Sequence, residues 1–443
     1  MSTVDLSQNY VPRQSSGKMT EFLKASPSYV FAIFAIIAAL CTYSCMYAFR
    51  KPFAVATFEG MKVLGIDYKI WLITSQGIGY MVSKFAGIKI ISEMKKGRRA
   101  AAILLLILSA WIFLFLFAII PPPWNIIFMF LNGLPLGMVW GIVFSYLEGR
   151  RMTELLGAGL SMSFIISSGL VKSIGKWLML TFGTSQFWMP FTTGAIFVIP
   201  LILFVWMLDR LPPPNIRDIE NRTQREPMTR KERIAFFSRF AWGLVLLVMA
   251  YTFLTAFRDF RDNFSAEMWN RLGYGKMPAI FTLTEIPVAI TVLLVISLIM
   301  LIKDNKTALM INFALIIFGF LITGAGTLLF SFHLINPPFW MILTGAGLYL
   351  GYVPFNAILF DRLIAAFKIV SNAGFLIYLA DSFGYLGSIG VLMYKNFGQP
   401  NLNWLNFFKY GAYISCILGI LLISFAWIYF SRKEYKSELV KYF

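Results

Sequence analysis

The sequence predicts an all-α membrane protein with about twelve transmembrane helices in two six-helix, pseudo-symmetric bundles. Three observations predict this class. Of the 443 residues, 58% are hydrophobic and only 14% are charged, whereas soluble domains are typically about 45–50% apolar and about 25% charged. Apolar stretches of about 20 residues, the length that crosses a bilayer, recur along the chain. Residues of the first half also recur in the second half at a nearly constant offset.

A charged central segment separates two sets of six apolar stretches. In the first half we expect spans over residues 28–53, 68–91, 100–120, 124–147, 157–181 and 187–208. In the second half we expect them over residues 240–263, 277–302, 307–332, 338–360, 371–394 and 404–430. The predicted organisation is therefore a tail, a bundle, a basic linker, a second bundle and a second tail, at residues 1–27, 28–208, 209–239, 240–430 and 431–443.

The loops alternate in charge along the chain. Basic residues gather in every second loop, as in the segment Lys95 to Arg99, whereas the opposite loops, such as 121–124 and 333–338, are nearly uncharged. Because basic loops stay on the cytoplasmic side, we expect both termini to be cytoplasmic, in an inner or plasma membrane. This distribution also explains the net charge of +18. We therefore expect the lipid bilayer, and no nucleic acid, as a partner.

The residues typical of metal and cofactor chemistry are scarce. Cys41, Cys45 and Cys416 all lie in apolar spans, and His333 is the only histidine. Cysteines in such positions are more often small buried hydrophobic side chains than ligands. We expect no metal, no cofactor and no enzyme activity.

A short pattern in the first span recurs in the seventh with an offset of 208 residues. Tyr43, Ala48, Phe49 and Arg50 are repeated as Tyr251, Ala256, Phe257 and Arg258. The triplet 173–175 recurs as 388–390 with an offset of 215, in the same order along the chain. The pattern indicates a duplicated chain, and in such membrane proteins the binding site commonly lies between the repeats.

Arg50 and Arg258 are the first candidates for that site. A guanidinium in a membrane span costs a few kcal/mol or more unless something compensates it, and it binds phosphate or carboxylate in a bidentate way. One arginine from each half could therefore hold an anion between the bundles. Two alternatives stay open: each arginine could snorkel to the outer interface, and Arg258 could pair with Asp262 at i+4.

Hydroxyl groups accompany both arginines. Tyr43, Tyr47 and Arg50 share one helical face by spacing, and Tyr251, Thr255 and Arg258 repeat that spacing. These hydroxyls could donate to ligand oxygens or form hydrogen bonds between helices.

Further charged residues lie within the predicted spans. Lys84 and Lys172 need a wet cavity or an acidic partner, and they predict a positively charged cavity. Lys176 either joins it or snorkels outward. Glu285 and Asp381 are the intramembrane acids, which either pair with a cation or titrate during a transport cycle.

Six plus six spans, a basic linker and repeated halves resemble the major facilitator superfamily. The loop after the second span, from Gly87 to Arg99, resembles that superfamily's glycine-and-basic motif. Within it, three stretches are most similar to the organophosphate:phosphate antiporters: 47–53, which contains Arg-Lys-Pro-Phe; 79–85, which ends in Ser-Lys-Phe; and Arg258 with Ser265. The resemblance implies that the two arginines hold a substrate phosphate and that Lys84 lies near the same pore.

One stretch departs from that family. Its glycerol-phosphate members carry a histidine in the fifth span, where this chain has Phe-Ile-Ile-Ser at 164–167, so the identity of the substrate stays open. The expected function is secondary active transport of a small anion, phosphate or an organophosphate first, by a monomer that uses alternating access. Anion exchange and proton coupling are both open. The alternative is a transporter-like membrane sensor or interaction protein that does not transport.

Overall fold

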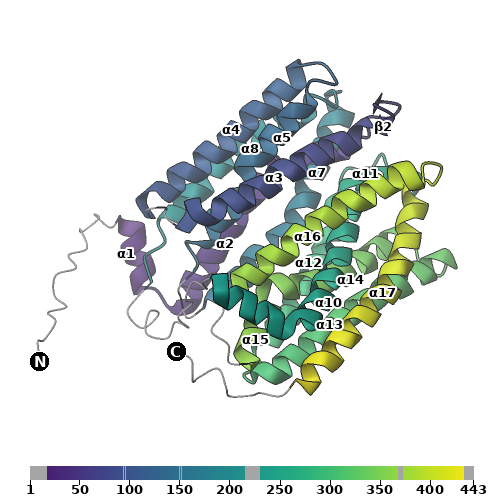
Figure 1. Cartoon of the computed structure of the whole chain (residues 1–443). Coiled ribbons are helices and arrows are strands. Elements are labelled where there is room, and N and C mark those ends of the chain that lie inside the picture. Colours follow the sequence, from purple (N-terminus) through teal and green to yellow (C-terminus); the bar gives the residue numbers. More distant parts are fainter. Residues whose placement is uncertain are drawn as a thin grey trace, which may run out of the picture.

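The computed structural model describes residues 17–92, 94, 96–148, 150, 152–214, 230–367 and 373–433. The first sixteen residues of the predicted N-terminal tail, residues 215–229 of the predicted linker and the last ten residues lie outside this part of the chain. Helices α1 to α8 and helices α10 to α17 form two bundles that lie side by side, purple to blue and green to yellow in Figure 1.

The first half is helical except for one small hairpin after its first long helix. Its elements are α1 (Lys18–Ala25), α2 (Ser28–Ala48), the 3₁₀ turn η2 (Pro52–Val55), β1 (Lys62–Val63), β2 (Ile66–Asp67), α3 (Tyr68–Ser92), η3 (Lys96–Arg98), α4 (Arg99–Ile119), α5 (Ile126–Phe144), α6 (Thr153–Ser161), α7 (Ser163–Thr181) and α8 (Met189–Asp209). The two strands pair antiparallel, with Lys62 opposite Asp67 and Val63 opposite Ile66.

The second half repeats the six long elements. They are α10 (Arg230–Asn263), α11 (Ser265–Arg271), α12 (Ile280–Met300), α13 (Asn305–Ser331), α14 (Pro337–Ala357), α15 (Leu359–Ala366), α16 (Ala373–Met393), the π-helical turn η4 (Tyr394–Gly398) and α17 (Trp404–Arg432). Three of these helices begin at an Asp or Asn whose side-chain oxygen accepts a backbone N–H of the first turn. This capping satisfies a donor that the helix itself leaves free.

Each of the twelve predicted spans coincides with a long helix or with a pair of consecutive helices. Within the described ranges, nine helices are long and apolar enough to cross a membrane, and the pair α14 and α15, bent by 49°, makes a tenth. Helices α3 and α16, of 25 and 21 residues, are not among them. Helix α3 contains Lys84 and α16 contains Asp381, and charged residues such as these lower the mean hydropathy of a helix.

Two predicted span ends were wrong. The first span ends at Ala48 and not at residue 53, and the tenth continues through α15 to Ala366 and not to residue 360. Helix α10 begins at Arg230, inside the predicted linker 209–239, but its apolar span, Ser238–Asn263, agrees with the predicted 240–263. The first error has a physical reason. Lys51 N–H still donates to the carbonyl oxygen of Tyr47, but Pro52 has no N–H to donate to the carbonyl oxygen of Ala48, so the α-helix ends and the chain continues in η2.

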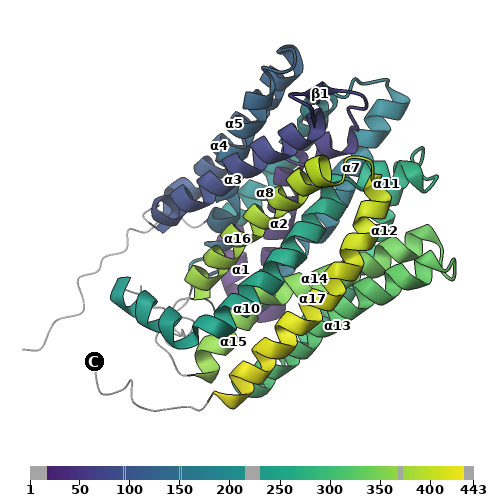
Figure 2. The same cartoon turned by 45° about the vertical axis from the view of Figure 1, so that its right-hand side comes forward.

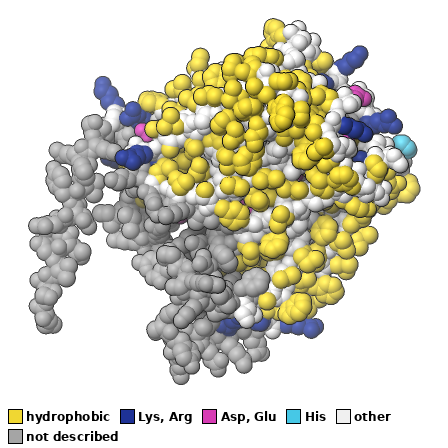
Figure 3. All heavy atoms as spheres, turned by 45° about the horizontal axis from the view of Figure 1, so that its top comes forward, with side chains coloured by type: hydrophobic (Ala, Val, Ile, Leu, Met, Phe, Trp, Pro, Cys, Tyr) yellow, Lys and Arg dark blue, Asp and Glu magenta, His cyan; other side chains and the backbone are white. Residues whose placement is uncertain are grey.

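The outer surface is that of an integral membrane protein. Large apolar side chains that face away from the core are strongly exposed, among them Leu105 (69%), Ile199 (79%) and Leu298 (65%). On the face seen in Figure 3, apolar side chains cover the centre and Lys and Arg lie around the edges. Such a broad apolar surface fits contact with lipid rather than water.

The two bundles touch along two lines. Helix α7 packs against α12, and α3 contacts α16. The turned view in Figure 2 likewise places α16 next to α3. These contacts leave α2, α5, α10 and α14 to face one another across the middle of the molecule, where the candidate site lies.

Close packing of α3 on α5 depends on glycine. A Cβ on Gly79 would lie 2.2 Å from the carbonyl oxygen of Phe130, whereas a Cβ on Gly77, two residues earlier, would meet nothing within 4 Å. Overpacking of this kind costs about 1–3 kcal/mol. We therefore expect Gly79→Ala to lower the thermal unfolding midpoint of the detergent-purified protein and Gly77→Ala to leave it unchanged or raise it. Equal midpoints for the two variants would contradict the packing described here.

Candidate functional site

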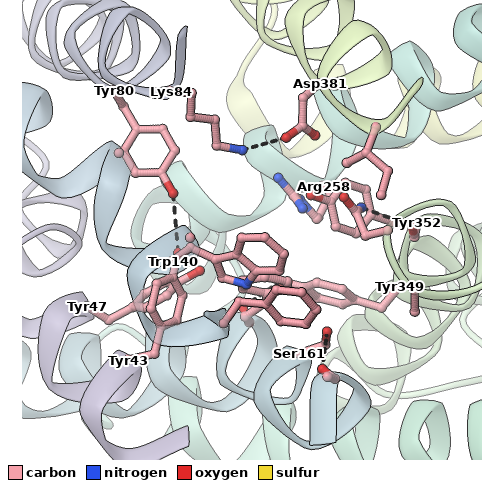
Figure 4. Close-up of a pocket in the computed structure, with 18 of the residues that line it drawn as sticks. Tyr43, Tyr47, Tyr80, Lys84, Trp140, Ser161, Arg258, Tyr349, Tyr352 and Asp381 are labelled. Atoms are coloured by element: carbon pink, nitrogen blue, oxygen red, sulfur yellow. Dashed lines mark hydrogen bonds and ion pairs between the residues drawn. The ribbon is translucent and has the colours of Figure 1, made fainter. Parts of the chain in front are cut away.

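A cavity of about 210 Å³ lies between the two bundles. Side chains from α2, α3, α5 and α6 line it on one side, and side chains from α10, α14 and α16 line it on the other (Figure 4). The lining extends from Arg50 and Asp262 to Thr153 and Asp361, which lie next to the basic residues Arg150 and Arg362. The cavity therefore extends toward the membrane face that carries the basic loops.

Buried amides position Arg50 at this cavity. The side chain of Asn132 in α5 donates to the carbonyl oxygen of Phe49 at 3.0 Å, and the side chain of Gln76 in α3 donates to that of Arg50 at 3.0 Å. The last carbonyl groups of a helix need such partners. Arg50 thus lies in the turn after α2, and not inside a helix as its copy Arg258 does, although both side chains line the cavity.

Each arginine lies on the face of a tyrosine from its own bundle. The guanidinium carbon of Arg50 is 3.8 Å from the ring centroid of Tyr80, and that of Arg258 is 3.8 Å from the ring centroid of Tyr352. A cation–π contact contributes about 0.5 to 2 kcal/mol. Such a contact orients the guanidinium, but alone it does not compensate a charge removed from water.

The two arginines differ in their counter-ions. Nη2 of Arg258 donates to Oδ1 of Asp259 at 2.6 Å. Among the described residues no carboxylate lies within ion-pair distance of Arg50, and its Nε is buried without a hydrogen-bond partner. Neither of the two open alternatives is found: Arg258 does not pair with Asp262, and neither arginine reaches an interface. Arg50 is therefore the unpaired guanidinium of the cavity.

Asp262 instead joins the two bundles at the end of the cavity away from the basic loops. Nζ of Lys51 lies 2.5 Å from Oδ2 of Asp262, and Nζ of Lys172 lies 2.6 Å from Oδ1. Ser168 also donates to Asp262, and Lys51 donates to Asn263 at 2.9 Å. Two lysines of the first half thus share one carboxylate of the second half.

A second ion pair joins the bundles at the same end. Nζ of Lys69 lies 2.5 Å from Oε1 of Glu267 in α11 and donates to the carbonyl oxygen of Ala54 at 2.7 Å. Burial raises the pKa of Glu267 above its usual value. Together with the Asp262 cluster, this pair closes the cavity on the side of the uncharged loops.

Asp381 forms an ion pair with a lysine, and such a pair was one of the two alternatives expected for the intramembrane acids. Nζ of Lys84 lies 2.5 Å from Oδ2 of Asp381, which connects α3 with α16 (Figure 4). Tyr251 donates to the other carboxylate oxygen, and Asn356 donates to the Tyr251 hydroxyl at 3.2 Å. Tyr251 is therefore a support for Asp381 and does not itself line the cavity.

Several other predicted site residues lie outside the cavity lining. Glu285 accepts from Arg261 at 2.7 Å within the second bundle. Thr255 packs against Gly384: a Cβ added to Gly384 would lie 2.9 Å from the Thr255 hydroxyl oxygen. Lys172 is buried on Asp262. Lys176 is partly exposed on α7 and forms no hydrogen bond or ion pair with any described residue. By contrast, Tyr43, Tyr47, Arg50, Lys84 and Arg258 all line the cavity.

Sequence reasoning missed the aromatic part of the lining. Tyr80, Trp140, Tyr349 and Tyr352 contribute to the cavity without having been selected. The internal repeat gave no signal for them. Leu136-Gly137 recurs as Leu350-Gly351 with an offset of 214 residues, which places Trp140 opposite Pro354.

Comparison with known proteins yields a family and a fold. A family model described as a family of unknown function, DUF5690, matches residues 52–433, whereas no curated protein matches. The chain is similar to the crystal structure of a D-xylose–proton symporter, with 17% identity, 90% of this chain and 98% of that chain covered, and a TM-score of 0.60. It is also similar to the nucleoside transporter NupG, with 15% identity, 91% and 99% coverage and a TM-score of 0.57.

A third similar structure is a bacterial homolog of the human lysosomal transporter Spinster, described as inward-facing and unoccupied. It shares 13% identity, with 91% of this chain and 97% of that chain covered and a TM-score of 0.55. At these identities the likeness concerns the fold. The chain has the fold of the major facilitator superfamily, as its repeated halves predicted.

The Asp262 cluster gives a test of the closed end. Asp262→Asn leaves Lys51 and Lys172 facing each other without a carboxylate, which destabilises a buried site. If the free energy that favours the closed end over the open one falls by about 1.4 kcal/mol, the population of molecules with that end open rises about tenfold. With Cys41, Cys45 and Cys416 replaced by alanine, a cysteine at Ser173, which is buried against Thr282, should react faster with a membrane-impermeant maleimide in this variant.

The matched control is Asp259→Asn, because Asp259 pairs with Arg258 inside one helix. We expect that variant to leave the labelling rate of the Ser173 cysteine unchanged. If Asp262→Asn labels no faster than Asp259→Asn, the cluster does not hold the bundles together.

Proposed function

We propose that this chain, which belongs to the family of unknown function DUF5690, is a secondary active transporter that moves a small anion by alternating access. The observation that carries the proposal is the unpaired guanidinium of Arg50 in a cavity between the bundles. A charge in such a place needs a cavity, a partner or a ligand. An anion would supply the counter-ion that the described residues do not.

The charges around the cavity support an anion over a cation. Asp259 and Asp381 are each paired with one cation, and Asp262 is shared by two lysines. Counting Lys172 behind the lining, five cations meet four carboxylates, because Asp361 also lines the cavity toward the basic loops. The excess of one positive charge, together with the unpaired Arg50, favours phosphate or an organic phosphate, which a guanidinium binds through two parallel hydrogen bonds.

Free hydroxyl donors add to this argument. The hydroxyl groups of Tyr47, Tyr352 and Tyr385 line the cavity and make no hydrogen bond within the described part of the chain. A hydroxyl can donate to an anion's oxygens. Three of the four carboxylates of the lining, Asp259, Asp262 and Asp381, are engaged with lysines or Arg258. The cavity thus offers hydroxyl groups that can donate to an anion, while most of its carboxylates are already paired.

The conformation supports alternating access. By the positive-inside rule the cavity extends toward the cytoplasm, and the Asp262 cluster and the Lys69–Glu267 pair close the opposite end. This is the arrangement of an inward-facing transporter. An anion between Arg50 and the second bundle would contact both halves, so that its binding would couple to their movement.

The same unpaired charge favours exchange of one anion for another. Without a ligand, reorientation would carry an uncompensated guanidinium through the occluded state, which is costly. With an anion bound, the charge is compensated. Proton coupling through Asp381 or Glu285 is the variant, since protonating either acid would release its cationic partner.

The proposal predicts that Arg50→Ala weakens anion binding strongly. A hydrogen bond to a charged group contributes about 1.5–3 kcal/mol, so we expect the affinity for inorganic phosphate to fall about 10- to 100-fold. Phosphate-dependent thermal stabilisation of the purified protein and exchange of radiolabelled phosphate into liposomes measure the two consequences. The control is Lys176→Ala, which removes a cation on α7 that does not line the cavity. This variant should bind and exchange phosphate like the wild-type protein.

Two outcomes would contradict the proposal. If Arg50→Ala binds and exchanges phosphate like the wild-type protein, Arg50 is not the anion site. Anion binding without any flux into liposomes would instead favour a membrane sensor built on a transporter fold.

A further inference from the structure

The cavity contains a second unsatisfied donor besides Arg50. Trp140 in α5 lines it, and the indole Nε1 of Trp140 is buried with no hydrogen-bond partner among the described residues. A buried tryptophan N–H usually finds a partner, and a buried donor without one costs about 1–3 kcal/mol. This donor is neutral, so it matches an uncharged acceptor as well as an anionic one.

The surroundings of Trp140 are aromatic. Its ring stacks on Phe144, one turn further along α5, with centroids 5.0 Å apart and an angle of 6° between the planes. Figure 4 shows Trp140 between Tyr43 and Tyr47 on one side and Tyr349 on the other, away from the Lys84–Asp381 pair. The cavity therefore has a charged part around Arg50 and a neutral aromatic part around Trp140.

The aromatic part reaches across both bundles. Phe164 of α7 packs edge-on against Tyr43, with ring centroids 5.7 Å apart, and its carbonyl oxygen accepts from the Tyr349 hydroxyl of α14 at 3.2 Å. Because that carbonyl and that hydroxyl are already engaged, the free donors of this wall are Nε1 of Trp140 and the hydroxyl of Tyr47, and of these only Nε1 is fully buried without a partner among the described residues. Such walls hold organic ligands through apolar and stacking contacts, and a few polar groups fix their orientation.

We propose that the substrate is an organic anion with a ring: its charged group binds Arg50, and its ring lies against the aromatic wall with an acceptor for the Trp140 indole N–H. This inference rests on the proposed function and narrows its substrate class. An inorganic oxyanion would supply a counter-ion for Arg50, but it has no apolar surface to bury against the aromatic side chains of the cavity. A neutral aromatic or sugar-like ligand leaves Arg50 without a counter-ion.

Four probes that each carry a phosphate group separate these contributions. Inorganic phosphate tests Arg50 alone, phenyl phosphate adds a ring, and the meta- and para-nitro derivatives of phenyl phosphate add acceptors on that ring. With full-length wild-type protein in detergent, we expect the dissociation constant to fall at least tenfold from inorganic phosphate to phenyl phosphate. At least one nitro derivative should bind more tightly still.

Trp140→Phe keeps an aromatic ring stacked on Phe144 and removes only the N–H. A neutral hydrogen bond contributes about 0.5–1.5 kcal/mol, so we expect this variant to bind that nitro derivative about 2- to 12-fold more weakly. Its affinity for inorganic phosphate should stay within twofold of wild type. Trp177→Phe, at a 43% exposed tryptophan on α7 outside the cavity, is the matched control and should change neither affinity.

The outcomes separate this inference from the function on which it rests. Equal affinities for all probes in the wild-type protein would overturn the inference and leave the anion site intact. An equal loss for every probe in Trp140→Phe would assign Trp140 a packing role and overturn it too. If no probe binds and Arg50→Ala behaves like the wild-type protein, both this inference and the proposed function are wrong. If Trp140→Phe does not fold, the affinities of the probes for the wild-type protein still test the inference.

Discussion

The cost of removing charge from water is the constraint on which the rest of this structure depends. Within a bilayer each buried cation needs a partner, and most cations around the cavity have one: Lys84 has Asp381, Arg258 has Asp259, and Lys51 and Lys172 share Asp262. Against this background Arg50 stands out, because no carboxylate in the described part of the chain lies within ion-pair distance of it. Its contact with the Tyr80 ring and the hydrogen bond from the Gln76 side chain to its carbonyl oxygen keep Arg50 in place, and this preorganisation is what the proposed anion site requires.

The placement of the ion pairs connects binding with conformation. Those that join the two halves lie at the closed end or beside the middle of the cavity, whereas Arg258–Asp259 and Arg261–Glu285 lie within the second half. Pairs within one half can persist through a rigid-body movement, but pairs between the halves must break when the closed end opens. The charges of the Asp262 cluster then become accessible, and in that state they would attract an anion from the other side. Under the proposed function, Arg50 binds the ligand, whereas the Asp262 cluster and the Lys69–Glu267 pair hold the closed end together.

Much of the fold followed from periodicity and repetition, whereas much of the site did not. Each of the twelve predicted spans coincides with a long helix or helix pair, nine or ten of which are long and apolar enough to cross a membrane. The offset of 208 residues identified Arg50 and Arg258, and both line the cavity. Spacing along a helix predicted Asp262 as the partner of Arg258, but the lysines that bind it come from α7 and from the turn after α2, far away in sequence. The end of α2 likewise depends on Gln76 and Asn132, which belong to other helices. Tertiary partners of this kind leave no local pattern, and Trp140 resembles any apolar span residue until its N–H is found unsatisfied.

The most direct test is an experimental structure of the full chain in the presence of tungstate, a heavy oxyanion with the shape of phosphate. The account predicts strong density in the cavity, within hydrogen-bond distance of the Arg50 guanidinium and facing the second bundle. Density confined to the basic loops, or an Arg50 side chain paired with a carboxylate in that structure, would contradict it.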